Sequence, residues 1–341
     1  MPTLDKRNGK ALADIAKFTS KDKTDVAKVD GITITTEPAH SPLWVCTGRN
    51  GYIMYSSDAI NWSEYRSPPS TSSDYWDISF GKDSNNNQLW FIPTNGGTEL
   101  RYSSDPTAGD SSWSTIDLPG TETTRAIEYG ANGTWIAATG SDVHRSTDGG
   151  TTWTKITSGT SGAGLMLCIA TDGAGTWVIG GSTNAIKSYD DGLNWYNTFT
   201  GKRANGIEYN NGVWFFASHT TTSYRATSIA QSNTTDTWSA VTGISKKLWA
   251  ICHITGNTWM TGGFDNAAPL ISTDNCASWS SVTSPSIGQV MGLASDGTTI
   301  VVCGKDSKIH TSTDNGSSWT LRFTTNSGDA LVVEYNKVKP F

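Results

Sequence analysis

The chain has 341 residues, of which 25 are Lys or Arg and 31 are Asp or Glu, so its formal net charge at pH 7 is −6. Because phosphate binding needs clustered positive charge, this acidic balance argues against a nucleic-acid surface. No stretch of the sequence approaches the roughly 18 apolar residues that span a bilayer, so we expect no membrane insertion. The 35 glycines indicate many short strands joined by tight turns.

Residues 1–40 differ from the rest in being densely charged, with seven Lys or Arg and six Asp or Glu. The spacing of apolar residues within Gly9–Phe18 predicts a short amphipathic helix. Charged termini often fray, but we expect this arm to dock, either on its own fold or, as we prefer, on a partner protein. The N-terminus lacks the apolar core of a secretory signal, which indicates synthesis in a cytoplasm. The apolar residues expected to dock are Leu12, Ile15, Phe18, Val26, Val29 and Ile32.

A short pattern recurs seven times along residues 41–341. Its plainest copy is Ser146–Trp153, which reads Ser-x-Asp-x-Gly-x-Thr-Trp. Successive tryptophans of the pattern are 40 to 51 residues apart, a period that predicts repeated units of about four strands. The acidic residue (Asn in one copy) and the tryptophan of each copy are Asp58 and Trp62, Asp105 and Trp113, Asp148 and Trp153, Asp190 and Trp195, Asn233 and Trp238, Asp274 and Trp279, and Asp314 and Trp319.

The chemistry of this pattern favours a structural turn. A short carboxylate can accept N–H groups of its own loop, glycine supplies a positive φ angle, and tryptophan buries a large ring beside the next strand. We therefore expect the copies to serve folding rather than to bind a metal or a sugar at each turn.

The pattern resembles the Asp-box of sialidase-type β-propeller repeats over about residues 43–341. The resemblance implies an all-β fold, a β-propeller of four-stranded antiparallel blades, and the count of copies gives seven blades. Blade one begins at its second strand, Leu43–Cys46, without a first strand before it. Ala330–Asn336 matches the first strands of other blades and has no blade of its own. We expect it to close the ring as the innermost strand of blade one, which removes the open edges of the stack.

The resemblance does not extend to sialidase chemistry. The sialidase family uses an arginine triad, a Tyr nucleophile assisted by Glu, and an Asp acid, so a sialidase-like site in this chain would need equivalents of these residues. Here Arg125 and Arg203 open inner strands, but a third equivalent is not evident. Glu128, Glu208 and Glu334 share one repeat position and are each followed by Tyr. A repeated position indicates scaffold, because a catalytic pair needs two different environments. We expect no enzyme activity.

No cofactor or metal site is expected either. The five cysteines are Cys46, Cys168, Cys252, Cys276 and Cys303, and none is in a CxxC spacing. Most lie in apolar runs, where free cysteine behaves as a small buried hydrophobe. We expect reduced, structural thiols.

The favoured function is a non-enzymatic structural or adhesion protein of a tailed-phage virion. The arm resembles short docking segments of tailed-phage structural proteins, and it would bind other virion proteins in a multi-copy assembly. The propeller would contact a host-surface glycan or a protein. The candidate ligand-face residues are Tyr75, Trp76, His219, Tyr224 and Trp249.

Two alternatives remain open. One is a sialidase-like glycoside hydrolase or a secreted carbohydrate-binding lectin. The other is the photosystem II assembly factor, a propeller similar in blade number and in its use of these turns. That family relies on an arginine-rich basic patch, which this acidic chain does not display. The chain would be virion-bound, or else cytoplasmic or exported without a signal peptide.

Overall fold

A computed structural model describes residues 27–29, 32–34, 41–67, 73–120, 122–264 and 268–336. The contacts divide the chain into two units, Met1–Ser41 and Pro42–Phe341. In the first unit β1 (Ala27–Val29) pairs with β2 (Ile32–Ile34), and Val29 is opposite Ile32. The helix expected within Gly9–Phe18 lies outside the described residues, as do the predicted docking residues Leu12, Ile15, Phe18 and Val26.

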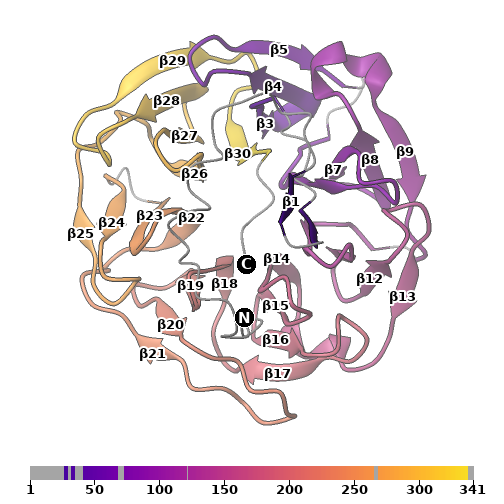
Figure 1. The fold of residues 1–341 in the computed structure, drawn as a ribbon. Helices are drawn as coiled ribbons and strands as arrows, with labels where there is room; N and C mark the ends of the chain where they lie inside the picture. The colour runs from indigo at the N-terminus through magenta and orange to yellow at the C-terminus, as the bar shows by residue number, and fades with distance from the viewer. Residues whose placement is uncertain are drawn as a thin grey trace. The chain divides into compact units, whose positions relative to one another are not determined.

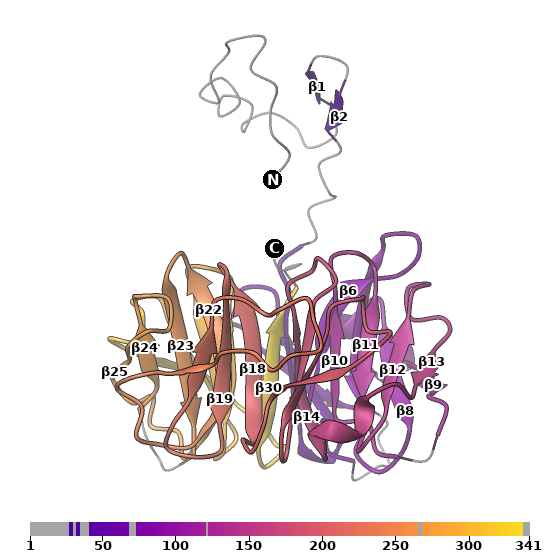
Figure 2. The same ribbon diagram turned by 90° about the horizontal axis from the view of Figure 1, so that it is seen from below.

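The second unit is a ring of seven four-stranded antiparallel sheets, or blades (Figure 1). Figure 2 shows inner strands such as β18 and β30 running along the axis of the ring. This confirms the predicted fold class. In order from the inner strand outward, the blades are β30 (Ala330–Tyr335), β3 (Trp44–Gly48), β4 (Tyr52–Ser56) and β5 (Ser63–Arg66); β6 (Ser79–Lys82), β7 (Gln88–Pro93), β8 (Glu99–Ser103) and β9 (Ser114–Asp117); β10 (Ala126–Tyr129), β11 (Trp135–Ala138), β12 (Val143–Ser146) and β13 (Thr154–Ile156); β14 (Met166–Thr171), β15 (Trp177–Gly181), β16 (Ala185–Ser188) and β17 (Tyr196–Phe199); β18 (Ala204–Asn210), β19 (Val213–Ser218), β20 (Tyr224–Ala226) and β21 (Ser239–Ala240); β22 (Leu248–Thr255), β23 (Thr258–Gly263), β24 (Leu270–Ser272) and β25 (Ser280–Ser281); and β26 (Val290–Ser295), β27 (Ile300–Gly304), β28 (Lys308–Ser312) and β29 (Thr320–Thr324).

Blade 1 contains both ends of the repeat array. Its inner strand β30 pairs antiparallel with β3, with Trp44 opposite Tyr335. The pairing continues beyond the strands, because the Leu43 N–H donates to the Asn336 side-chain oxygen at 2.8 Å. The Asn336 N–H donates back to the Leu43 carbonyl at 3.0 Å. The predicted closure by Ala330–Asn336 is thus confirmed.

The hydrophobic core lies between neighbouring blades as a series of apolar layers. In six blades a tryptophan begins, or nearly begins, the second strand, and it is at most 2% exposed. A strand buried on both faces needs apolar residues at successive positions, and the second strands have this pattern. The six tryptophans are Trp44, Trp90, Trp135, Trp177, Trp214 and Trp259.

The Ser-x-Asp turns use their carboxylates internally. One oxygen of Asp314 accepts the Ser318 N–H at 2.9 Å and the Ser312 hydroxyl at 2.8 Å, and the other accepts the Ser318 hydroxyl at 2.6 Å. The Ser312 hydroxyl oxygen in turn accepts the Gly316 N–H at 2.8 Å. Each bond satisfies a group that the tight turn would otherwise leave without a partner. Comparable carboxylate bonds form at Asp58, Asp148, Asp190 and Asp274.

The copy in blade 5, which carries Asn233 in place of Asp, is stabilised differently. Asp236 accepts the Ala230 N–H at 2.6 Å and lies 2.8 Å from the Lys187 ammonium of blade 4. Both side chains of this ion pair are almost fully buried. The Thr198 hydroxyl also donates to Asp236 at 2.5 Å. These hydrogen bonds offset the loss of hydration of the buried Asp236 carboxylate. A different carboxylate thus stabilises this turn and also joins two blades.

The closing strand generates a first prediction. Val333 of β30 is 2% exposed in the layer between blades 1 and 7. Val333→Asp is expected to destabilise the propeller by about 3–5 kcal/mol, because it places an unpaired charge in that layer. Leu321→Asp on the outer strand β29, where the side chain is 49% exposed, is the matched control and should change stability by less than about 0.5 kcal/mol. Urea unfolding followed by tryptophan fluorescence measures the stability change of each variant. Equal destabilisation by the two substitutions would contradict the closure.

The turn carboxylates generate a prediction about acid stability. Hydrogen bonds from the Ser318 hydroxyl and N–H lower the pKa of Asp314 to about 2, against about 3.9 in an unfolded chain. A lowered pKa stabilises the fold above the unfolded value, and this stabilisation is lost as pH falls through about 2. Asp314→Asn should therefore lower the melting temperature at pH 7, and the difference from wild type should shrink below pH ~4.

Thermal melts across this pH range make the measurement. Asp117→Asn, at an exposed carboxylate on β9, is the control and should leave the melting temperature nearly unchanged. A constant difference between wild type and Asp314→Asn down to the lowest pH would contradict the assignment.

Candidate functional site

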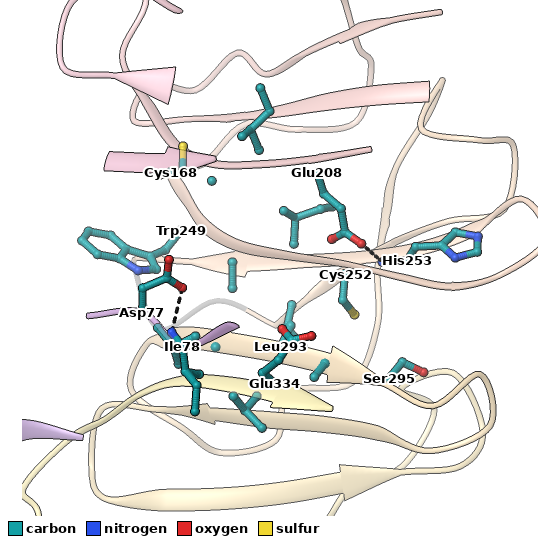
Figure 3. A pocket seen from close by; sticks show the side chains of 18 of the residues that line it. Asp77, Ile78, Cys168, Glu208, Trp249, Cys252, His253, Leu293, Ser295 and Glu334 are labelled. Atoms are coloured by element: carbon teal, nitrogen blue, oxygen red, sulfur yellow. Dashed lines mark hydrogen bonds between the residues drawn. The ribbon is translucent and has the colours of Figure 1, made fainter. Parts of the chain in front are cut away.

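The inner strands of the blades enclose a cavity of about 720 Å³ in the central channel (Figure 3). Because the blades repeat around the axis, the N-terminal ends of the inner strands meet at one end of the channel. Trp76 precedes β6, Arg125 precedes β10, Arg203 precedes β18, and Trp249 is the second residue of β22. All four line the cavity. We call this end, defined by these four residues, the channel mouth.

Two carboxylates in the cavity are engaged by backbone groups. One Asp77 oxygen accepts the Ile78 N–H and the other accepts the Ile127 N–H of blade 3, each at 2.9 Å. Glu208 of blade 5 accepts the His253 N–H of blade 6 at 3.2 Å (Figure 3). An inner strand has one edge without a neighbouring strand, and these carboxylates satisfy N–H groups that this edge would leave open. They join neighbouring blades.

Aromatic side chains meet across the channel mouth. The rings of Trp76 in blade 2 and Trp249 in blade 6 have centroids 6.1 Å apart at an angle of 42°. Phe264 packs edge-on against Trp249 at 5.3 Å, and His219 packs edge-on against Phe264 at 5.4 Å. We call these four side chains the aromatic bridge. Since blades 2 and 6 are not neighbours in the ring, only its curvature brings these tryptophans together.

Arg49 holds one end of the bridge. Its guanidinium lies 5.5 Å from the centroid of the Trp76 ring, a cation–π distance. The same guanidinium pairs with Asp74 at 2.9 Å and with Asp329 at 2.7 Å. Two carboxylates thus fix the cation, and the cation fixes the indole.

Two further guanidiniums lie at the channel mouth without a carboxylate partner among the described residues. The Arg203 Nε–H donates to the Asn205 side-chain oxygen at 3.2 Å, and Arg125 makes no ion pair there. The pKa of His219 is lowered, first by burial and then by the positive charges of Arg203 and Lys247. The channel mouth therefore contains the positive charges of Arg125 and Arg203 together with the carboxylate of Asp77, which follows Trp76.

Three of the five predicted ligand-face residues come together, and two do not. Trp76, Trp249 and His219 belong to the aromatic bridge. Tyr75 is fully buried and its hydroxyl donates to the Ser67 carbonyl, so it offers no ring face to a ligand. Tyr224 packs edge-on against Phe199 within the blade 5 cluster at 4.8 Å. Tyr75 is therefore corrected to a packing role, whereas the ligand role of the half-buried Tyr224 stays a prediction.

Sequence reasoning did not select Phe264 or Arg49, and it considered Arg125 and Arg203 only as members of a catalytic triad. An Arg-Ala pair opens both β10 and β18, and this repeated pair is the signal for the two cations at the channel mouth. No comparable signal marks Phe264, which follows a strand end and contacts residues distant in sequence.

The cysteine thiol of Cys252 lines the cavity. Burial raises the pKa of the Cys252 thiol well above its usual value, and the negative charges of Glu208 and Glu334 add to the effect. A protonated thiol is a poor nucleophile. Within the described ranges, no group of three or more His, Cys, Asp or Glu residues could hold a metal ion. The same residues include no helix long and apolar enough to cross a membrane.

This chain is similar in fold to several solved structures, at low sequence identity. No family model and no curated protein matches the chain. It is similar to the solved structure of YCF48 bound to D1 peptide, with a TM-score of 0.59 and 16% identity over 77% of this chain and 86% of that one. It is also similar to YCF48 from Cyanidioschyzon merolae, with a TM-score of 0.56 and 14% identity over 74% of this chain and 86% of that one. The computationally designed Ika8 protein gives a TM-score of 0.58 and 9% identity over 86% of this chain and 90% of that one.

The buried thiol generates a third prediction. Because the pKa of Cys252 is raised, the thiol stays protonated at pH 8, and the side chain is only 5% exposed. Iodoacetamide should modify Cys252 slowly in the native protein and rapidly in urea, as mass spectrometry of the Cys252 peptide would measure. Rapid modification of the native protein would indicate a reactive thiolate and would favour Cys252 as a nucleophile in the channel.

Proposed function

We propose that this chain is a non-enzymatic binding protein that holds a segment of a partner polypeptide at the channel mouth. The observation that carries the proposal is the meeting of Trp76 and Trp249 in a concave site that Arg125 and Arg203 also line. Tryptophan and arginine are enriched among the residues that contribute most to protein interfaces. Their gathering at one end of a channel favours binding there.

Two carboxylates that line the cavity support a non-enzymatic role. Glycoside hydrolysis uses two carboxylates, one of which donates a proton while the other attacks or activates water. Both oxygens of Asp77 accept backbone N–H groups, and Glu208 accepts another. Carboxylates held in this way contribute to the scaffold. The protonated Cys252 does not replace them as a nucleophile.

The surroundings of the aromatic bridge favour a polypeptide over a sugar. Leu165 is 39% exposed and lines the same cavity as Leu167 and Ile251. Aliphatic groups beside aromatic rings suit apolar amino-acid side chains, whereas sugars need many directional hydrogen bonds to their hydroxyls. YCF48, which has a similar fold, has been solved bound to a D1 peptide. A propeller of this kind is therefore able to accommodate a peptide, and we extend that ability to this chain.

The narrower hypothesis places the chain in a tailed-phage virion, anchored by residues 1–40 and in contact with a host-surface glycan. It depends on the N-terminal arm, of which the structure describes only β1 and β2. It stays a prediction, and it is compatible with polypeptide binding at the channel mouth, since a virion neighbour is itself a polypeptide.

The proposal is tested by selecting binders from a random peptide library and measuring their affinities by calorimetry. Trp249→Ala should weaken the selected peptides at least tenfold, because a buried aromatic contact of an interface typically contributes more than about 1.4 kcal/mol. Tyr189→Ala, which removes an aromatic ring stacked on Tyr196 in blade 4, is the control and should not alter binding. A library that yields only binders insensitive to Trp249→Ala, or turnover of a fluorogenic glycoside, would contradict the proposal.

A further inference from the structure

The Asn205 side chain holds His219 of the aromatic bridge in one orientation. Asn205 is the extra residue of a β-bulge, because the pairing of β18 with β19 shifts by one residue between Ala204 and Gly206. A bulge re-aims the side chain of its extra residue. Here the Asn205 amide nitrogen lies 3.1 Å from the His219 Nδ1, and the Asn205 side chain is buried.

The other partners of Asn205 decide which atom of its amide faces His219. The amide nitrogen donates to the Leu248 carbonyl of blade 6 at 2.8 Å, and the amide oxygen accepts the Arg203 Nε–H at 3.2 Å. Exchanging the two atoms would place two acceptors together at Leu248 and two donors together at Arg203. The second hydrogen of the amide nitrogen is therefore left for His219, whose Nδ1 accepts it and carries no proton. The proton of the neutral ring lies on Nε2.

A second proton, on the His219 Nδ1, would be opposed by its neighbours. It would meet the Asn205 N–H, so that one donor would face another. The charged groups that act on His219 are Arg203, which precedes β18, and Lys247, which precedes β22, and both are positive. No carboxylate among the described residues contributes to the pKa of His219. The neutral ring thus fits this position, whereas the imidazolium has to turn away from Asn205.

The orientation of His219 acts on Trp249 through Phe264. The His219 ring packs edge-on against Phe264 with centroids 5.4 Å apart, and Phe264 packs against Trp249 at 5.3 Å. We infer that His219 is a positioning residue that holds the aromatic bridge ready for its ligand only while its ring is neutral, so that binding at the channel mouth is lost in acid. This inference rests on the proposed function and names the regulation of that site.

The pH range follows from the direction in which the pKa of His219 moves. A free histidine has a pKa of about 6.5, and burial, then Arg203 and Lys247, lower the pKa of His219 in the bridge. Above about pH 6.5 both forms of the ring are neutral, and the bridge keeps its full stability. As the pH falls from there through the lowered pKa, proton uptake favours the ring that has turned away. The turn carboxylates Asp274 and Asp314, with pKa values of about 2, stay ionised in this range.

The first test needs no ligand. NMR of the full chain follows the His219 ring nitrogens and the Trp249 indole N–H from pH 8 to 4.5, with assignments from His219→Phe and Trp249→Phe. The His219 proton should lie on Nε2 at pH 8, and the Trp249 resonance should shift with the same midpoint as His219, below pH ~6.5. His219→Phe, which keeps an aromatic ring beside Phe264 but cannot titrate, should abolish that shift. His253→Gln, at a histidine outside the bridge that packs against Trp259, is the control and should preserve it.

The second test measures the selected library peptides by calorimetry over the same pH range. Affinity should fall by up to about tenfold per pH unit below the His219 midpoint, which is the limit for one linked proton. His219→Phe should bind with an affinity that no longer depends on pH there.

The outcomes separate this inference from the proposed function. Peptides whose affinity stays constant across the His219 midpoint would overturn the inference and leave peptide binding intact. A proton on Nδ1 at pH 8, or a Trp249 shift that persists in His219→Phe, would also overturn it. Should no peptide bind at pH 7.5, the proposed function fails, and the Trp249 resonance alone decides whether His219 positions the bridge.

Discussion

The pairing of β30 with β3 is the constraint on which the rest of the propeller depends. A stack of blades buries apolar surface between neighbours, but its first and last blades would each expose a face to water. Joining both ends of the repeat array in blade 1 gives every blade two neighbours, so all the apolar layers form. Hydrogen bonds between Leu43 and Asn336 extend the pairing beyond the strands.

A closed ring creates a second requirement. Each inner strand has one edge that faces the channel and pairs with no other strand, so the backbone groups of that edge need other hydrogen-bond partners. Asp77 and Glu208 supply some of these partners by accepting N–H groups of the next blade. Their role in holding blades together explains why carboxylates can lie in the channel of a protein that we propose to be non-enzymatic. The cavity also contains Arg125, whose Nε–H has no hydrogen-bond partner among the described residues. Carboxylates that join blades and the residues that we propose to bind a ligand thus line the same cavity.

The irregular fifth blade illustrates how a repeat tolerates loss of its own motif. Asn233 cannot supply the carboxylate of the other turns, and Asp236 takes over by pairing with Lys187 of blade 4. A buried ion pair needs several hydrogen bonds to offset the loss of hydration, and Ala230 and Thr198 provide them. The blade keeps its four strands, although β21 is only two residues long.

The sequence by itself determined the fold, including seven blades and closure by Ala330–Asn336, because turn and strand signals are local and the repeat shows them several times. It determined the candidate site only in part. Trp76 and Trp249 were selected, but the neighbouring Tyr75 was selected too, since no regular strand at residues 73–78 indicates which side chain is buried. Only the tertiary structure decided that Trp76 and Trp249 meet. This contact joins non-adjacent blades, and the curvature of the closed ring, rather than local sequence, sets it.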